Sequence, residues 1–235
     1  QLNMAAVIPG KEEFHGMLAY FRRMIELSNV NVRLNTRASV DDLSSFDEVI
    51  VATGVTPRDT GIEGQDHAKV LTYIDVLAGK AKVGEKVAVI GAGGIGFDVS
   101  EYLVQEHPSP TVNLDEWLEE WGVGDPEKVQ GGLSPQGPQP SAPARQVTLL
   151  QRKASKHGAG LGKTTGWIHR SSLRMKDVSF IGGVNYERIG DEGLMISDGE
   201  ARENPRWLDV DNIILCAGQE SLRELAEPLE AKGVT

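Results

Sequence analysis

Apolar residues recur with two periods along the chain, and these periods predict its helices and strands. Apolar residues that recur at steps of three and four predict an amphipathic helix over 11–28. They are Phe14, Met17, Leu18, Phe21 and Ile25. Alternating or continuous short apolar runs, several ending at glycine, predict strands instead. Strands are predicted at 30–34, 46–52, 86–90, 147–151 and 212–217, and further helices at 73–78, 97–103 and 164–173.

The second half of the chain adds a cluster of short strand candidates separated by turn residues. They lie at 178–181, 185–189, 194–197 and 207–210, and their spacing predicts a small antiparallel meander. Elsewhere strands alternate with helices around a glycine-rich turn, as in parallel sheets. We therefore expect an α/β fold: a Rossmann-like, doubly wound parallel sheet with an antiparallel meander.

Composition changes between 107 and 144, where seven of the chain's 11 prolines lie. This Pro/Gly-rich stretch predicts an insertion with little regular structure of its own. One short helix is expected within it, with its apolar residues directed toward the body of the protein: Leu114, Trp117, Leu118 and Trp121.

The strand at 86–90 runs directly into glycines spaced G-x-G-x-x-G, and a helix follows. Such a turn suits the pyrophosphate of a dinucleotide, because the first glycine allows the bend, the second admits the phosphates and the third lets helix and strand pack closely. The helix start adds free N–H groups and partial positive charge. A plain glycine-rich turn is the alternative reading. The expected binding residues are Gly91, Ala92, Gly93, Gly94, Ile95 and Gly96.

Charge and cysteine content narrow the function classes. The 235 residues carry a net charge of −10, which argues against general nucleic-acid binding. No apolar run approaches the ~20 residues of a membrane span. Cys216 is the single cysteine, so no internal disulfide forms and a cytoplasmic setting is expected. The Cys and His spacing predicts no metal site, and no residue is assigned a catalytic acid or base role.

Basic residues are concentrated in the segment that is expected to contact the ribose of a bound dinucleotide. Eight Lys and Arg lie in 145–176 without a single Asp or Glu. If 147–151 is the second strand of the βαβ unit, Arg152 and Lys153 stand where an acid would select NAD, and a forked guanidinium suits the 2′-phosphate of NADP. We therefore expect NADP(H) rather than NAD(H), with a solvated basic face as the alternative.

The segment 158–164 imitates an ATP-binding P-loop. Its first required glycine position is occupied by His157, and no buried strand end leads tightly into it. An ATPase loop is therefore not expected. A loop that supplies Lys163 or Lys156 to the phosphates is the preferred interpretation.

Several segments together resemble a known family. They are IPGKEEFHGMLAYFRRMIE, VIVATGVTPR, KVAVIGAGGIGFDV, GGLSPQG, LLQRKASKHGAGLGKTTGWIHR and NIILCAGQE. They closely resemble the C-terminal part of the bacterial NADPH-dependent 2,4-dienoyl-CoA reductases, which are old yellow enzyme-like flavoproteins with an iron–sulfur cluster. The most specific match is the stretch 149–170.

The resemblance implies a domain organisation. Residues 1–60 would be part of a second, nested FAD-type dinucleotide domain, 61–220 the NADP(H)-binding domain and 221–235 a return toward the FAD domain. Two small-residue strand ends would mark the crossings close to flavin or nicotinamide: Ala52, Thr53 and Gly54, and Ala217 and Gly218.

The resemblance also implies that important parts lie elsewhere. FMN, its N-terminal barrel, the 4Fe–4S cluster and the remainder of the FAD domain are expected in a longer chain, as partners of this segment. That enzyme would pass hydride from NADPH to FAD and electrons onward to FMN, to reduce 2,4-dienoyl-CoA in unsaturated fatty acid β-oxidation. The segment alone is expected to be inactive. A related oxidoreductase acting on another enone or an amine, or a non-catalytic nucleotide-binding module, are the alternatives.

Overall fold

The computed structural model describes residues 2–106 and 108–234. Gln1, His107 and Thr235, which bound three of the predicted segments, lie outside the described residues. The body of the molecule is a five-stranded parallel sheet in the order β2-β9-β3-β4-β5. Its strands are β2 Val70–Thr72, β3 Lys86–Ile90, β4 Gln146–Gln151, β5 Ser179–Gly182 and β9 Asn212–Leu215.

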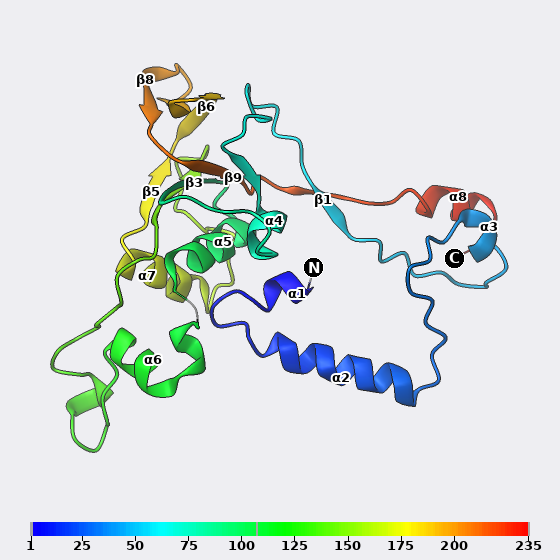
Figure 1. Ribbon diagram of the computed structural model, residues 1–235, viewed down its shortest axis with the longest axis horizontal. Helices are drawn as coiled ribbons and strands as arrows, with labels where there is room; N and C mark the ends of the chain where they lie inside the picture. Colours follow the sequence, from blue (N-terminus) through cyan, green and yellow to red (C-terminus); the bar gives the residue numbers. More distant parts are fainter. Residues whose placement is uncertain (1, 107, 235) are drawn as a thin grey trace.

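Helices cover one face of this sheet and a meander covers the other (Figure 1). The helices are α4 Tyr73–Leu77, α5 Gly94–Val104 and α7 Gly166–Met175, and the meander strands are β6 Val184–Gly190, β7 Gly193–Asp198 and β8 Glu203–Leu208. Two buried apolar clusters lie on the two faces. Val87 and Val89 pack toward the helices, whereas Ala88 and Ile90 pack toward the meander. A strand covered on both faces reads as a continuous apolar run, as 87–90 does.

The predicted α/β fold with a parallel sheet and antiparallel strands is confirmed. The strand predicted at 178–181 forms, but it does not belong to the meander in which it is expected. β5 instead pairs in parallel with β4, with Thr148 opposite Ser179. A single short strand beside a meander has the same local pattern in either sheet, so only its pairing distinguishes them.

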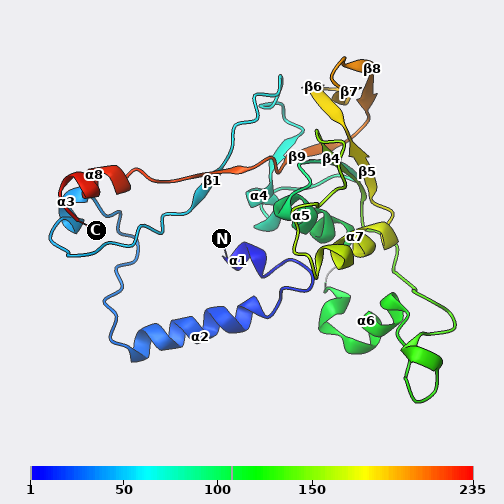
Figure 2. The same ribbon diagram turned by 180° about the vertical axis from the view of Figure 1, so that it is seen from behind.

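A two-stranded ribbon leaves the body and carries a smaller group of elements (Figures 1 and 2). β1 Val55–Pro57 pairs antiparallel with β10 Gln219–Ser221 and leads to α3 Val40–Leu43 and α8 Ala226–Ala231. We call residues 14–57 and 219–234 the arm. It also contains α2 Phe14–Leu27, which follows the short α1 Leu2–Ala5.

Two predicted strands of the arm are wrong. Residues 30–34 and 46–52 form no strand, and Leu34 and Ile50 are 78% and 94% exposed. A strand needs a partner for its backbone N–H and C=O groups. Among the described residues neither segment lies beside one, so an apolar pattern alone did not produce a strand. The helix predicted at 11–28 forms as α2, but none of its residues is buried.

The Pro/Gly-rich insertion is ordered around α6 Leu114–Trp121, with two short 3₁₀ turns at Pro110–Val112 and Gln130–Gly132. Asn113 caps α6 by accepting from two backbone N–H groups, and Gly122 ends the helix in the left-handed conformation. The predicted helix is therefore confirmed, but its apolar face is only partly covered: Trp117, Leu118 and Trp121 are half-buried, whereas Leu114, at the start of the helix, is 70% exposed. No helix among the described residues has the length and apolar character needed to cross a membrane.

Candidate functional site

The carboxyl ends of β3, β4 and β9 meet at one edge of the parallel sheet, where α/β proteins place their ligands. β4 is the direct parallel neighbour of β3, with Lys86 opposite Gln146 and Ile90 opposite Leu150. β9 flanks β3 on the other side. The predicted first βαβ unit, from the glycine turn to the strand that precedes Arg152, is therefore present in the structure.

The glycines of the turn differ in the space that each would leave for a side chain. Gly91 has a φ of +111°, and a Cβ there would lie 2.5 Å from the Cys216 carbonyl oxygen. A Cβ on Gly96 would lie 1.7 Å from the Gly91 carbonyl oxygen, because α5 passes directly over the turn. At Gly93 and Gly94 a Cβ would meet nothing within 4 Å. The first and last glycines are thus needed for packing, and the middle ones leave open space in front of the helix.

That open space lies at the start of an 11-residue helix whose first residue, Gly94, follows a glycine N-cap with no side-chain cap. The first-turn N–H groups of a helix have no intrahelical acceptor and carry a partial positive charge. Here no side chain satisfies them from the N-cap position. The turn therefore fits the pyrophosphate of a dinucleotide.

Two adjoining cavities of about 340 and 330 Å³ open at this edge. The first, the turn cavity, lies over the glycine turn and the loop after β4. The second, the connector cavity, lies between the 58–63 connector and β6. Both are lined by Ile90, Arg152, Tyr186 and Ala217.

Predicted basic residues line the turn cavity, namely Arg152, Lys153 and Lys156. Among the described residues none of these three side chains has an ion-pair partner, so their charge is free for a ligand. The loop that carries them is anchored by Gln151, whose side-chain amide donates to the carbonyls of Lys153 and Ser155. The end of β4 thus presents an organised cationic group beside the glycine turn.

Other predicted residues occupy different positions. Gly91, Ala92 and Gly93 line the turn cavity, whereas Gly94, Ile95 and Gly96 begin α5 behind it. Lys163 is exposed and does not line either cavity, so its role stays a prediction.

The two small-residue strand ends lie apart in the structure. Ala217 lines both cavities and Gly218 follows it, with its carbonyl accepting from the Arg58 N–H at 3.0 Å. Ala52, Thr53 and Gly54 instead precede β1, and Thr53 lines a separate cavity of about 510 Å³ in the arm. The two ends are connected through the β1–β10 ribbon rather than through one shared cavity.

The pattern of apolar runs indicates neither Tyr186, which lines both edge cavities, nor the ion pair of Asp98 on α5. Tyr186 comes from the meander, and burial raises the pKa of its phenol, with Arg152 acting in the opposite direction. Asp98 in α5 accepts from Lys11 Nζ at 2.6 Å, which ties the N-terminal segment to α5. Residues 11 and 98 are 87 positions apart, so no local pattern could have indicated their contact.

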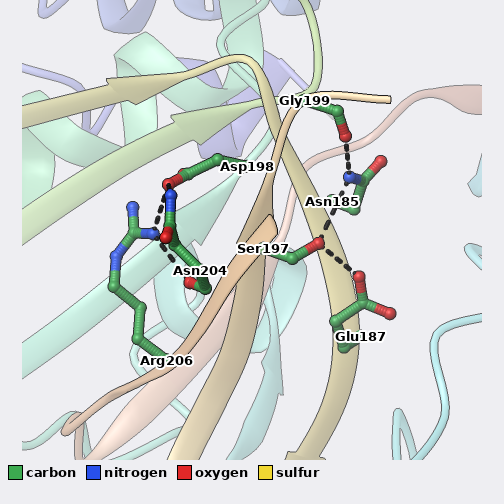
Figure 3. Close-up of polar contacts among 7 residues, drawn as sticks. All are labelled: Asn185, Glu187, Ser197, Asp198, Gly199, Asn204 and Arg206. Carbon is green, nitrogen blue, oxygen red and sulfur yellow. Dashed lines mark hydrogen bonds and ion pairs between the residues drawn. The ribbon is translucent and has the colours of Figure 1, made fainter. Parts of the chain in front are cut away.

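Side chains of the meander that line the connector cavity are linked by hydrogen bonds. Glu187 accepts from Ser197 Oγ (Figure 3). It also accepts from Arg202 Nη1 at 2.6 Å. Asn185 donates to the Gly199 carbonyl at 2.6 Å. These contacts orient the Glu187 carboxylate at the cavity and pair it with the more exposed Arg202. Cys216, at the end of β9, is buried in the apolar cluster on the helix side of the sheet, and burial raises the pKa of its thiol, which suits packing rather than redox chemistry.

No group of three His, Cys, Asp or Glu side chains in residues 2–106 and 108–234 is arranged to hold a metal ion. His169 Nδ1 lies 2.9 Å from Glu101 Oε1. This pair lies on the helix layer, away from both edge cavities.

Comparison with known proteins places this geometry in a family. Residues 19–235 match the sequence profile described as pyridine nucleotide-disulphide oxidoreductase. The chain is 25% identical to a metal reductase of Desulforamulus reducens over 99% of its own length and 34% of that protein. It is also 34% identical, over 113 residues, to a cinnamate reductase of Clostridium sporogenes, covering 45% of this chain and 17% of that protein.

Solved structures share the fold. A 2-naphthoyl-CoA reductase in complex with 2-naphthoyl-CoA superposes with a TM-score of 0.74 at 21% identity, over 99% of this chain and 30% of that one. An amine oxidase for 6-hydroxypseudooxynicotine from Pseudomonas geniculata N1 superposes with a TM-score of 0.64 at 20% identity, over 97% and 30%. The chain thus spans about a third of the length of the metal reductase that it matches from end to end.

Proposed function

The chain belongs to the pyridine nucleotide-disulphide oxidoreductase family, and from this premise we propose that it is the NADP(H)-binding part of a flavin-dependent oxidoreductase. The observation that carries the proposal is the meeting of two features at one sheet edge. The open glycine turn at Gly93 lines the same cavity as Arg152 and Lys153, two cations with no ion-pair partner in the part of the chain that the structure describes.

The residues at this edge fit NADP(H) part by part. The α5 N-terminus and the turn Gly91–Gly93 would hold the pyrophosphate. Arg152, with Lys153 and Lys156 beside it, would hold the 2′-phosphate, since a guanidinium pairs with phosphate through two parallel hydrogen bonds. Bound NADPH supplies the hydride, and the residues of this chain bind and orient it. Lys163 would approach the phosphates only if the 158–164 loop closes over them.

Residues 61–220 form the proposed NADP(H) domain, and 1–60 with 221–235 the proposed contribution to an FAD domain. The pairing of β1 with β10 supports this division, because it is where the chain passes out of the sheet body and back. FMN and a 4Fe–4S cluster are proposed for a longer protein that contains this segment.

Measurement of dinucleotide affinity tests the nucleotide assignment. Arg152→Ala should weaken NADPH about tenfold to a hundredfold, the loss of one or two charge-assisted hydrogen bonds, and leave NADH nearly unchanged. Lys82→Ala is the matched control, because that exposed cation precedes β3 at the opposite end of the strand. An unchanged NADPH preference in Arg152→Ala would contradict the assignment.

For the whole protein we propose reduction of a conjugated thioester, with 2,4-dienoyl-CoA as substrate. The support is the resemblance of 149–170 to that family, together with relatives named for cinnamate and 2-naphthoyl-CoA reduction. An amine substrate is the second candidate, favoured by the fold shared with an amine oxidase.

NADPH oxidation by a longer protein containing this chain, followed with a 2,4-dienoyl-CoA, another enone and an amine in parallel, decides between them. Turnover with the amine or the other enone alone would contradict the dienoyl-CoA proposal. Absence of NADPH oxidation with every acceptor, including a redox dye, would favour a non-catalytic nucleotide-binding module.

A further inference from the structure

The three cations of the turn cavity lie in one short loop after β4. We call residues 152–158 the cationic loop, since Arg152, Lys153 and Lys156 belong to it and line that cavity. All three side chains are exposed, and the loop has no helix or strand of its own. Such a loop normally loses conformational entropy when it closes on a ligand, which weakens binding. The contacts of this loop with the sheet body reduce that loss, because they order its backbone in advance.

Gln151, the last residue of β4, holds the first half of the cationic loop. Its side-chain amide donates to the carbonyl oxygen of Lys153 at 2.9 Å and to that of Ser155. Both N–H groups of the amide are thus used on the loop backbone. The Lys153 carbonyl also accepts from the backbone N–H of Gly183, at 3.1 Å, in the turn between β5 and β6. The loop is therefore attached to the ends of two neighbouring strands.

His157 holds the far end of the loop. Its Nε2 lies 3.1 Å from the carbonyl oxygen of Ile181 in β5, and its ring packs edge-on against Phe180 with centroids 5.2 Å apart. Burial lowers the pKa of His157, so the imidazole is neutral at pH 7 and donates its Nε2–H to that carbonyl. The next residue is held as well, because the Gly158 carbonyl accepts from Arg170 Nη1 of α7 at 3.3 Å. At the position where a P-loop would need glycine, this chain thus has an imidazole that fixes the loop to β5.

From these contacts we propose that Gln151 and His157 are positioning residues that set the preference for NADPH over NADH. They hold the cationic loop at the turn cavity before the dinucleotide binds, so that the 2′-phosphate meets cations on an ordered backbone. NADH lacks this phosphate and gains little from the ordered loop. The inference rests on the proposed NADP(H) assignment, and it adds that selectivity depends on the fixed backbone as well as on charge.

Gln151→Leu tests the role of the amide, because it removes both donated hydrogen bonds and keeps every cation. NADPH should bind about tenfold more weakly, whereas NADH should change by less than about twofold. A merely structural defect would weaken both dinucleotides together. Gln146→Leu is the matched control, since this exposed glutamine lies at the opposite end of the same strand. It should change neither affinity when both are measured by titration calorimetry.

A double-mutant cycle separates positioning from direct contact, because Gln151 itself lines the turn cavity. In an Arg152→Ala background fewer cations remain to be ordered, so Gln151→Leu should weaken NADPH only about threefold or less. A loss of the same size in both backgrounds would show that Gln151 acts independently of Arg152, and would overturn the proposal.

His157→Phe offers a second route if Gln151→Leu does not fold. It keeps an aromatic ring beside Phe180 and removes the hydrogen bond to the Ile181 carbonyl, so NADPH should weaken about threefold to tenfold and NADH should not. If Arg152→Ala abolishes the preference for NADPH while the folded Gln151 and His157 variants retain it, the positioning role is wrong and the NADP(H) assignment stands. If Arg152→Ala leaves the preference unchanged, both are wrong.

Discussion

The sheet body and the arm carry similar apolar patterns but bury them very differently. In the body, Val87 to Ile90 and Ile213 to Ile214 are completely buried between helices and meander. In the arm, Phe21 and Ile50 are 53% and 94% exposed although their sequence contexts predicted a core-facing helix and a buried strand. The comparison shows that an apolar repeat supplies a surface for packing, and that burial depends on a second surface beside it.

The largest expected difference in stability between body and arm concerns their ion pairs. Lys176→Met in the body should lower the free energy of unfolding by about 3 to 5 kcal/mol, because the buried Glu120 carboxylate loses its charge partner. Lys232→Met in the arm removes a partner of the exposed Asp41 and should cost about 0 to 1 kcal/mol. Urea denaturation measures both, and equal losses would contradict the distinction.

Two isoleucines give the next largest contrast. Ile214→Ala truncates a completely buried side chain of β9 and should lower the free energy of unfolding by about 2 to 5 kcal/mol. The loss combines the hydrophobic transfer free energy of the removed atoms with the cost of the cavity that they leave. Ile50→Ala, at 94% exposure, should stay within about 0.5 kcal/mol of the wild type. A large loss for Ile50→Ala would show that this part of the arm is packed in solution.

The smallest expected effect is one of pH, and its sign differs between the two regions. Hydrogen bonding to Glu101 raises the pKa of His169 above 6.5, and burial raises the pKa of Glu101. The folded chain then binds more protons than the unfolded one. This contribution to stability is therefore complete below about pH 6.5 and is lost as pH rises through the folded pKa of His169.

In the arm, hydrogen bonds from Ser39 lower the pKa of Asp42 below 3.8, so that contribution is present above pH 3.8 and is lost as pH falls. Burial lowers the pKa of His157, which acts in the opposite direction over the same range, so the contribution of the pair is measured as a difference. From about pH 5 to about pH 8, the unfolding free energy of the wild type minus that of Glu101→Gln should decline as pH rises. Asp42→Asn should leave the slope in this range as it is. A steeper decline in Glu101→Gln would show that the sign assigned to the pair is wrong.

Prediction from sequence succeeded best where elements were long or bounded by clear turns. The strand–turn–helix unit at 86–104, the α6 helix and the strand before Arg152 were all predicted. β2 Val70–Thr72 was not predicted, since three residues give too short a pattern. The edge strand at 178–181 was recognised as a strand but assigned to the meander, because neighbouring strands look alike until pairing is known.

The residues of the candidate site, like the elements of the fold, were predictable only where a local motif marks them. Gly93 and Arg152 follow from local motifs. Tyr186 did not, because it comes from a meander strand whose apolar and polar alternation says nothing about the sheet edge it meets. Lys163 was placed with the phosphates from a P-loop-like spacing, and the structure puts it outside both edge cavities.

Neighbouring residues along the chain specify the local chemistry: a glycine turn between a strand and a helix, cations after the second strand, and a proline-rich insertion with two tryptophans. These follow from φ preferences, side-chain charge and periodicity, which act between neighbours in the chain. Which strands pair and which apolar faces are buried depends instead on the tertiary structure, as does the cavity that Gln105 and Trp117 both line. Those contacts join residues far apart along the chain, and packing against a second surface is what selects them.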